Sequence, residues 1–478
     1  MIDLSKNYLP EKIRHIHLLG ICGTGMGSLA GMLKEKGYQV SGSDQAVYPP
    51  MSTFLTGLGI EIAGGYRPEN LRPQPDLVIV GNVITRVNPE AQELIRLKLP
   101  FLSLPQALAE FFLQDKISLV ITGTHGKTTT SSLLASILDR TGLAPSFMIG
   151  GILKGYERNY QLGLGPYFVI EGDEYDTAFF DKGPKFLHYR PHCAVLTSIE
   201  FDHADIYPDV RAIQEAFSRF LAIIPKEGLL VAYGADPRIQ EILHQAPCPV
   251  ETYGMEENWD WHLKELATHE NGSRFAVYHR GNFWYRFESP LIGRHNALNF
   301  LSLIPLLLRI GLGPEDMARG LAEFQGIHRR QEIRGIRAGV TVIDDFAHHP
   351  TAVRETLRAV RSQYQDRRLI AVFEPRTNTS RRNFFQKDYV SSFNGADIIL
   401  IREAPDLEKI PEGERFSSAL LVEELKNSGK QARYFPNTDE ILEFLSTLLR
   451  GGDVVLIMSN GGFEGIHEKL LEMLGSRS

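Results

Sequence analysis

The segment ISLVITGTHGKTTTSSLLASIL at residues 117–138 decides the fold class of this chain. It opens with an apolar run, passes through a glycine-containing turn and continues into a stretch typical of a helix. A strand, a glycine loop and a helix in this order form a phosphate-binding unit, because the N–H groups that begin the helix face the loop. We therefore predict an α/β protein with a parallel sheet.

The residues of the loop have the types that a nucleotide phosphate needs. Lys127 can supply a positive charge, and the hydroxyl of Thr128 can bind Mg²⁺. The usual spacing GxxxxGK[ST] requires glycine at position 121, where this chain has Ile121, so the loop is a variant. We predict that ATP binds at Gly123, Thr124, His125, Gly126, Lys127, Thr128 and Thr129.

Two further segments repeat the pattern of an apolar run followed by a polar or glycine-rich turn. The first is HIHLLGICGTGMG at residues 15–27, and the second begins after HRRQEIRG with VTVIDDFAHHP at residues 340–350. Shorter strand-like runs follow each of them, so each predicts its own parallel sheet. We place the boundaries between the three parts near residues 113 and 327. Residues 248–288 alternate weakly and predict an antiparallel excursion.

Composition excludes several classes of protein. The 478 residues suggest about three domains, and the net charge of −7 gives no electrostatic footprint for nucleic acid. No apolar run approaches the ~20 residues of a membrane helix, and the N-terminus lacks the pattern of a secretory signal. The three cysteines (Cys22, Cys193 and Cys248) are scattered and cannot form a disulfide framework. We expect a soluble, cytoplasmic protein without nucleic-acid or membrane partners, and the sequence leaves a monomer or a homodimer open.

The first glycine loop predicts a diphosphate site. Gly20, Gly23 and Gly25 lie between a strand and a helix, where glycine lets the backbone approach a pyrophosphate. Asp44, in the turn SGSD, follows the next strand at a place suited to a ribose hydroxyl. The spacing is GxxGxG rather than GxGxxG, so a nicotinamide enzyme is only one candidate, and a tight turn that binds nothing is the alternative.

Two groups of acids predict a metal site beside the phosphate loop. YFVIEGDEYD holds Glu171, Asp173, Glu174 and Asp176, and SIEFDHAD holds Glu200, Asp202, His203 and Asp205. Oxygen ligands at the carboxyl ends of parallel strands are what Mg²⁺ on a nucleotide requires, while solvated loop acids are the alternative reading. Asn296 and Asn299, three residues apart in GRHNALNF, share a face if the segment is helical.

Taken together and in order, these motifs resemble the Mur ligase family of ATP-dependent amide-forming enzymes. The resemblance rests on GICGTGMG, SGSD, GTHGKTTT, IEGDEYD, FDH, GRHNALN, HRR and DDFAHHP, which cover almost the whole chain. It implies a Rossmann-like UDP-sugar-binding domain at 1–113, a central ATP-binding domain with a parallel sheet at 114–327, and a Rossmann-like domain for ATP and the peptide acceptor at 328–478.

Several strings are similar to the branch of this family that recycles peptidoglycan. They are VYPPMST (47–53), GNVITRVNP (81–89), EFDHADIY (200–207), FEPRTNT (373–379) and MSNGGFEGIH (458–467). This branch joins UDP-N-acetylmuramate to the tripeptide L-alanyl-γ-D-glutamyl-meso-diaminopimelate through an acyl phosphate. The resemblance therefore implies a role in cell-wall biogenesis, with UDP-N-acetylmuramate, ATP and the tripeptide as small-molecule partners and two Mg²⁺ ions as cofactors.

The resemblance also implies roles for individual residues. Catalysis would depend on Lys127 at the β- and γ-phosphates, on Glu171 and His203, and on Arg330. Thr128 and Glu171 would hold one metal ion and His203 a second. Further ATP contacts would come from Asn296, Asn299, Arg330, Asp345 and His348, and the UDP-sugar would contact Gly20, Gly23, Thr24, Gly25, Met26, Ser43, Asp44 and Asn82. The acceptor would contact Arg376, Asn378, Ser459 and Asn460, with Arg381 and Arg382 as further candidates.

One departure from sibling enzymes matters for the second metal. Ligases that add later residues carry a carbamoylated lysine downstream of the metal histidine, whereas this chain has no lysine between His203 and Lys226 and has Phe217 near the equivalent place. The remaining ligand of that metal and the base that deprotonates the amine stay open.

Three rival functions remain at this stage. The nearest is the ligase that adds free L-alanine to UDP-N-acetylmuramate. A nicotinamide-dependent oxidoreductase would leave GTHGKTTT without a purpose, and a non-catalytic ATP-gated protein would have no need for Glu171, His203 and Asp345 together.

Overall fold

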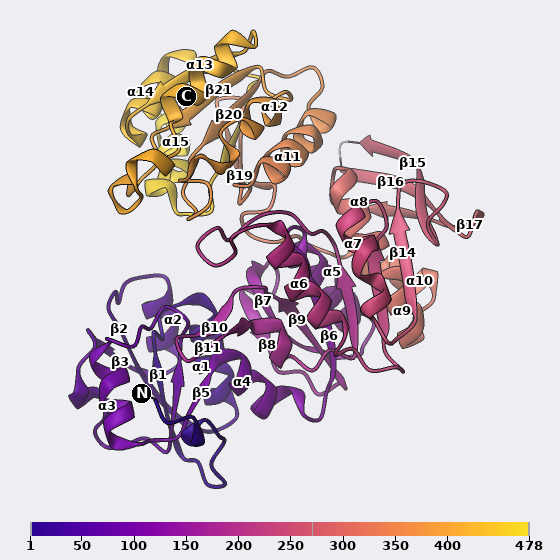
Figure 1. Cartoon of the computed structure of the whole chain (residues 1–478). Coiled ribbons are helices and arrows are strands. Elements are labelled where there is room, and N and C mark those ends of the chain that lie inside the picture. The colour runs from indigo at the N-terminus through magenta and orange to yellow at the C-terminus, as the bar shows by residue number, and fades with distance from the viewer. Residues whose placement is uncertain (1, 270, 477–478) are drawn as a thin grey trace.

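The computed structural model describes residues 2–269 and 271–476, which form three lobes that follow one another along the chain (Figure 1). The first lobe contains strands β1–β5, the second β6–β17 and the third β18–β23. Across these described residues, the search for a helix with the length and apolarity of a membrane span returns none.

The first lobe is a parallel sheet in the order β3-β2-β1-β4-β5. Its strands are β1 (His15–Leu19), β2 (Gln39–Asp44), β3 (Glu61–Gly64), β4 (Leu77–Val80) and β5 (Phe101–Ser103). Its helices are α1 (Thr24–Glu35), α2 (Met51–Gly57), α3 (Pro89–Leu97) and α4 (Leu104–Leu108). Because β1 lies between β2 and β4, the turns that follow these three strands meet at one edge of the sheet.

The second lobe contains a sheet in the order β17-β16-β15-β14-β13-β12-β6-β9-β7-β8. Its strands are β6 (Ile117–Thr122), β7 (Ser146–Leu153), β8 (Arg158–Gln161), β9 (Tyr167–Gly172), β12 (Cys193–Leu196), β13 (Leu229–Tyr233), β14 (Val250–Gly254), β15 (Trp261–His269), β16 (Gly272–His279) and β17 (Asn282–Ser289). A hairpin of β10 (Asp176–Ala178) and β11 (Asp181–Pro184) stands apart from it.

The centre of this sheet is parallel, as the sequence predicts, and β15, β16 and β17 pair antiparallel. The antiparallel excursion predicted at 248–288 is therefore confirmed for β15 to β17, whereas β14, which lies in the same range, pairs parallel with β13 and β15. The helices are α5 (Lys127–Arg140), α6 (Val210–Leu221), α7 (Pro237–Ile242), α8 (Arg294–Leu301), α9 (Ile304–Ile310) and α10 (Pro314–Ala322).

The third lobe is a sheet in the order β18-β19-β23-β20-β21-β22, parallel except for the β18–β19 pair. Its strands are β18 (Glu332–Arg337), β19 (Val340–Asp345), β20 (Leu369–Phe373), β21 (Ile398–Arg402), β22 (Gln431–Phe435) and β23 (Val454–Met458). Its helices are α11 (Pro350–Gln363), α12 (Asp388–Ser392), α13 (Ser418–Asn427), α14 (Thr438–Leu448) and α15 (Ile466–Gly475). Its central strands are buried on both faces, which is why they read as continuous apolar runs.

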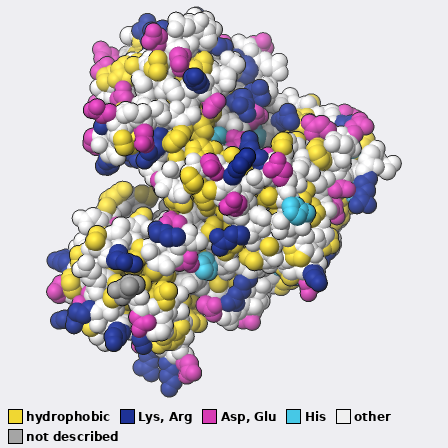
Figure 2. All heavy atoms as spheres, in the orientation of Figure 1, with side chains coloured by type: hydrophobic (Ala, Val, Ile, Leu, Met, Phe, Trp, Pro, Cys, Tyr) yellow, Lys and Arg dark blue, Asp and Glu magenta, His cyan; other side chains and the backbone are white. Residues whose placement is uncertain are grey.

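The lobes differ in how they meet. The first and third lobes lie on the same side of the molecule with a notch between them in the space-filling view (Figure 2). The third lobe instead rests on the second, where α11 contacts α8 and β15. The edge of the second sheet that carries the phosphate loop therefore faces the start of the third lobe.

Candidate functional site: a nucleotide pocket between two lobes

The phosphate loop joins β6 to α5, and its two glycines are required by geometry. Gly123 has φ +125°, and a Cβ there would lie 2.2 Å from Thr197 Oγ1. Gly126 has φ +80°, and a Cβ would lie 2.7 Å from Asn299 Oδ1. Any larger residue at these positions would clash and would have to adopt a left-handed conformation that disfavours it.

The beginning of α5 is suited to an anion. The N–H of Thr130 donates to Gly126 O at 3.0 Å, whereas the N–H groups of the preceding residues belong to the first turn and lack an intrahelical acceptor. Within the described chain, no side chain caps this helix. Backbone donors and the helix dipole thus point together at the place that a phosphate would occupy.

Lys127 lies at the mouth of the loop with its charge held in place. Its Nζ donates to Gly123 O at 2.6 Å and to Glu174 Oε2 at 3.1 Å. Burial alone would lower the pKa of Lys127, but the carboxylates of Glu174 and Asp173 outweigh burial and raise it. The ammonium group is therefore charged, as phosphate binding requires.

Glu171, near the end of β9, bridges the backbone of Gly150 and the side chain of Thr128. One of its carboxylate oxygens accepts the N–H of Gly150 at 2.7 Å, and the other accepts the Thr128 hydroxyl at 3.2 Å. Arg330 Nη2 donates to the same hydroxyl at 3.3 Å. Burial raises the pKa of Glu171, so a cation beside it would hold the carboxylate in its charged form. Thr128 and Glu171 together are a hydroxyl and a carboxylate of the kind that Mg²⁺ uses.

A second group of metal-type donors lies next to Lys127. Single donor atoms of Asp173, Glu174 and His203 lie within 4.8 Å of one another. His203 Nε2 is 3.3 Å from Glu174 Oε1, and burial, which would lower its pKa, is outweighed by Glu174 and Asp202, so that the pKa is raised to about 9. Two carboxylates and an imidazole fit a divalent cation once the proton on His203 has left.

The pocket above the loop has a volume of about 690 Å³ and is lined from both lobes. Its lining includes Asn296 and Asn299 on α8, Arg330 after the second lobe, Asp345 at the end of β19 and His348 just beyond it. Asn299 Nδ2 is 3.4 Å from Asn296 Oδ1, so the two residues do share a face of the helix. The pocket brings together residues from the second and third lobes that the sequence predicted for ATP.

The pocket also has lining residues that the sequence did not predict, among them Ser198, His295 and Phe346. Ser198 Oγ accepts the N–H of His125 at 3.0 Å, and the guanidinium of Arg330 lies 4.7 Å from the centre of the Phe346 ring. His295 and Phe346 each neighbour a predicted residue, Asn296 and Asp345, and this adjacency is the signal that could have found them.

The acids of the two predicted clusters differ in their partners. Asp176 begins β10 and pairs with Lys182 at 2.6 Å, away from the metal-type donors. Glu200 lies 3.3 Å from His125 Nε2 and accepts the Thr351 hydroxyl at 2.8 Å, so it joins the phosphate loop to α11. Single donor atoms of Glu200, His125 and His349 lie within 4.8 Å of one another, so the prediction of Glu200 as a metal ligand stays open. Phe217 lies in the core on α6, 5.4 Å from the Phe186 ring, and cannot take the place of a metal-binding side chain.

The first glycine loop has the geometry of a close backbone approach. Gly20 has φ +80°, and its N–H donates to Ser43 O at 2.9 Å. Gly23 immediately precedes α1, which begins at Thr24 and contains Gly25 and the buried Met26. The carboxylate of Asp44 accepts the Cys22 N–H at 2.9 Å, so it holds the loop itself, and Asn82 follows β4 at the same edge.

The residues predicted for the acceptor lie at the carboxyl ends of β20 and β23. Arg376, 43% exposed as a side chain, lies 3.7 Å from the buried carboxylate of Glu374, which also accepts the Ser459 hydroxyl at 2.6 Å. Asn378 accepts a hydrogen bond from Arg381 at 2.8 Å. Among the described side chains, Asn460 Oδ1 and Arg381 Nε are buried without a hydrogen-bond partner. Arg382 instead pairs with Glu414.

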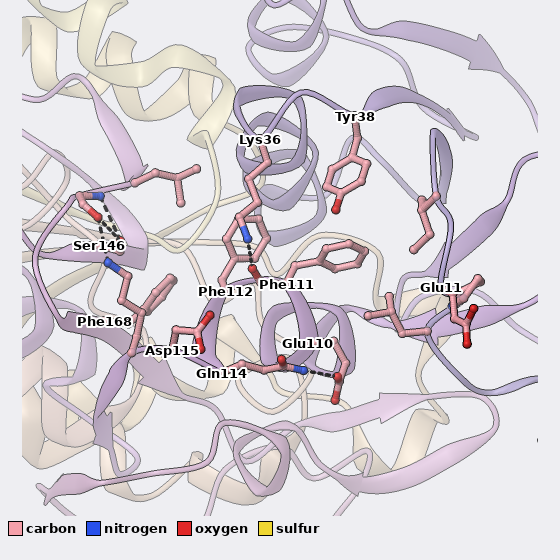
Figure 3. Close-up of a pocket in the computed structure, with 16 residues that line it drawn as sticks. Glu11, Lys36, Tyr38, Glu110, Phe111, Phe112, Gln114, Asp115, Ser146 and Phe168 are labelled. Carbon is pink, nitrogen blue, oxygen red and sulfur yellow. Dashed lines mark hydrogen bonds between the residues drawn. The ribbon is translucent and has the colours of Figure 1, made fainter.

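A second cavity of about 500 Å³ lies where the first and second lobes meet, and it holds none of the predicted site residues (Figure 3). Lys36 donates to Phe111 O, and Lys116 Nζ donates to Gly163 O at 3.0 Å. Both ammonium groups thus form hydrogen bonds with backbone carbonyls of neighbouring segments. This cavity belongs to the junction of the lobes.

Comparison with known proteins agrees with this arrangement. The sequence matches three family descriptions in chain order: the Mur ligase family catalytic domain over residues 15–116, the Mur ligase middle domain over 121–306, and the Mur ligase glutamate ligase domain over 328–461.

Individual relatives match over nearly their whole length. The chain is 40% identical to the UDP-N-acetylmuramate–L-alanyl-gamma-D-glutamyl-meso-2,6-diaminoheptandioate ligase of Escherichia coli, over 97% of this chain and 99% of that one. It is 34% identical to a UDP-N-acetylmuramate–L-alanine ligase of Clostridium kluyveri, over 94% and 96%. The crystal structure of a murein peptide ligase from Psychrobacter arcticus matches with 36% identity and a TM-score of 0.72, over 97% and 99%.

Proposed function

The chain belongs to the Mur ligase family, and we propose that it joins UDP-N-acetylmuramate to the tripeptide L-alanyl-γ-D-glutamyl-meso-diaminopimelate, with hydrolysis of ATP to ADP and phosphate. The observation that carries this function is the pocket in which the phosphate loop, two groups of metal-type donors and residues of the third lobe meet. The tripeptide as acceptor is supported by the 40% identity to the Escherichia coli enzyme. The reaction belongs to peptidoglycan recycling.

The chemistry begins with activation of a carboxylate. A carboxylate does not react with an amine at neutral pH because oxide is a poor leaving group, whereas transfer of the γ-phosphoryl of ATP to it gives an acyl phosphate with a good one. Bound Mg²⁺ would neutralise charge on the phosphates. Lys127 binds the β- and γ-phosphates, the N–H groups of α5 hold the phosphate chain, and Arg330 approaches from the side of the third lobe.

The residues present fit two divalent cations. Thr128 with Glu171 would hold one, and His203, beside Asp173 and Glu174, would hold the other. His203 must lose its proton before it can bind a cation. Once His203 is neutral, Lys127 is the charged side chain of the protein that pairs with Glu174.

The second half-reaction takes place where the acceptor amine meets the activated carboxylate. Arg376, Asn378, Ser459 and Asn460 are assigned to the acceptor, because guanidinium groups bind carboxylates in a bidentate manner and this tripeptide carries several. The unpartnered Asn460 Oδ1 and Arg381 Nε are polar atoms that an acceptor could satisfy. The tetrahedral oxyanion formed by amine attack would be stabilised by the same positive charges.

The division of labour among the lobes follows from these assignments. We assign residues 1–113 to the UDP-sugar, through Gly20, Gly23, Thr24, Gly25, Met26, Ser43, Asp44 and Asn82. Residues 114–327 bind ATP, and 328–478 complete the ATP pocket and bind the acceptor. The substrates are small molecules, and we propose that the enzyme works in the cytoplasm.

The test is ADP release with Mg-ATP and UDP-N-acetylmuramate, with the tripeptide or free L-alanine added in parallel. We expect turnover with the tripeptide and little with L-alanine. Turnover with L-alanine alone would instead place the chain with the alanine-adding ligases, to which it is 34% identical in the Clostridium kluyveri example. Addition of excess EDTA is expected to stop release of ADP in either case.

A further inference from the structure

One short loop of the second lobe makes several polar contacts with the third lobe. Residues 199–205, here called the docking loop, lie in the connection between β12 and α6 and include His203. Three successive residues accept hydrogen bonds from the third lobe: Glu200 from Thr351 at 2.8 Å, the Phe201 carbonyl from His349 at 3.3 Å, and Asp202 from Thr379 at 2.7 Å. The docking loop therefore forms part of the surface against which the third lobe packs.

One atom of Asp202 contacts both the third lobe and His203. Its Oδ1 accepts both the hydroxyl of Thr379 and the backbone N–H of His203, each at 2.7 Å. The Asp202 side chain is buried, and His203 has a left-handed backbone with φ +53°, which is uncommon for a residue other than glycine. Asp202 Oδ1 therefore binds the backbone of His203 and is itself bound by a hydroxyl of the third lobe.

Thr379 lies on the segment that also carries the proposed acceptor contacts. It follows β20, three residues after Arg376, and is buried. Its Oγ1 also accepts the N–H of Ala204 at 3.4 Å, so it contacts the docking loop on both sides of His203. Placement of the acceptor segment and placement of His203 are consequently joined through one side chain.

We propose that Asp202 and Thr379 are positioning residues that set the direction of His203 when the third lobe docks. The inference rests on the proposed function only in that the pocket binds ATP with divalent cations. Without the Thr379 hydroxyl, Asp202 Oδ1 keeps only its local N–H partner, and the docking loop loses the contact that fixes its turn. Errors of an ångström in the position of a reacting group are costly in rate.

The test compares three variants at position 379 with a matched control. Thr379→Val removes the hydroxyl at nearly constant shape, Thr379→Ala removes it with less steric risk, and Thr379→Ser restores it. Thr438→Val is the control, because Thr438 is buried in the same lobe and its hydroxyl has no partner among the described residues. Mn²⁺ binding in the presence of a non-hydrolysable ATP analogue is followed by electron paramagnetic resonance, together with ATP turnover.

We expect Thr379→Val and Thr379→Ala to weaken one Mn²⁺ and to lower kcat about tenfold each, the scale of a lost hydrogen bond to a charged group. The KM for ATP should change less than about threefold, since the phosphate loop is untouched. Thr379→Ser should recover most of both quantities, and Thr438→Val should behave as the parent does.

The proposal is overturned if folded Thr379→Val and Thr379→Ala bind Mn²⁺ as Thr438→Val does, or if Thr379→Ser fails to restore binding. Failure of the proposed function would look different. The parent protein would then turn over with L-alanine or not at all, while the Mn²⁺ titration, which contains no acceptor, would still report on position 379.

Discussion

Lys127 shows how one residue serves both the architecture and the chemistry of the pocket. It binds the carbonyl of Gly123 within its own loop and the buried Glu174 on the neighbouring segment. Its type and place follow from the sequence motif, whereas its carboxylate partner is known only from the fold. The charge is thus in position before any nucleotide arrives.

Replacement of Lys127 should abolish the reaction. We expect Lys127→Met to lower kcat for ADP release by more than about 100-fold, because a preorganised cation at a developing phosphate charge is lost. The thermal midpoint should also fall, since Glu174 loses one of its two charged neighbours. Lys182→Met, at an exposed lysine on β11, is the control and should keep full activity. A Lys127→Met enzyme with near-parental kcat would remove Lys127 from the mechanism.

The burial of His349 predicts that the free energy of unfolding falls as the pH is lowered. It is buried at the boundary between the lobes, where its ring caps α11 and contacts the carbonyl of Phe201. Burial, helped by His125, lowers its pKa from 6.5 to about 3. The unfolded chain therefore binds more protons than the folded one below pH 6.5, so stability falls as the pH drops, by up to about 1.4 kcal/mol per pH unit for this group.

The measurement is denaturant unfolding of the parent and of His349→Asn between pH 7.5 and 5. Asparagine keeps a capping side chain at the start of α11 but does not titrate. The variant should show a shallower loss of unfolding free energy as the pH falls, while Glu200, whose pKa is lowered to about 2, stays charged throughout. Identical pH profiles for the two proteins would exclude His349 as the titrating group.

At the scale of elements, the three sheets follow from local pattern. The apolar runs at 77–80 and 167–170 form β4 and β9. The weakly alternating stretch at 248–288 contains the parallel strand β14 and most of the antiparallel strands β15 to β17. A strand buried on both faces has a continuous apolar run, and one with a solvated face alternates, so both kinds are readable from the sequence. Helix α1 begins at Thr24, so Gly25 of the first glycine loop already lies in its first turn.

Helix α6 provides an element-scale prediction. Phe217 lies on its buried face, packed between the sheet and the Phe186 ring. We expect Phe217→Ala to lower the free energy of unfolding by about 3–5 kcal/mol, the cost of an aromatic-sized cavity in a core. Activity at 25 °C should stay within about threefold of the parent, since no metal-type donor is removed.

The matched control is Glu215→Ala, at an exposed position of the same helix, where the change in unfolding free energy should stay within about 0.5 kcal/mol. Chemical denaturation of both variants measures the difference. A loss of Mn²⁺ binding in a folded Phe217→Ala protein would show that this position acts on the metal site after all.

At the scale of the whole molecule, the pocket depends on two lobes at once. Arg330, Asp345 and His348 reach the nucleotide pocket from beyond the second lobe, and the docking loop holds the third lobe through residues more than 140 positions away. Ligands that bridge two lobes stabilise their closed arrangement. Closure of the lobes would narrow the notch between the first and third lobes (Figure 2).

We expect the radius of gyration in solution to fall when a non-hydrolysable ATP analogue and UDP-N-acetylmuramate are added together. Small-angle scattering measures this change. Arg330→Ala should reduce it, since one of the contacts between the lobes at the pocket is lost. Arg337→Ala, at an exposed arginine of β18, should respond as the parent does. Scattering curves that do not change with ligands would contradict closure.

The sequence by itself determined the α/β class, the phosphate loop and the order of the three sheets, because these depend on residue type, local spacing and periodicity. The tertiary structure decided which side chains meet. The sequence predicts Glu200 and Asp202 as possible metal ligands, and the fold gives them further partners, Thr351 and Thr379, which are 151 and 177 positions away. Which side chains form hydrogen bonds depends on their distance in the folded molecule after the lobes have docked. The local sequence pattern does not determine that distance.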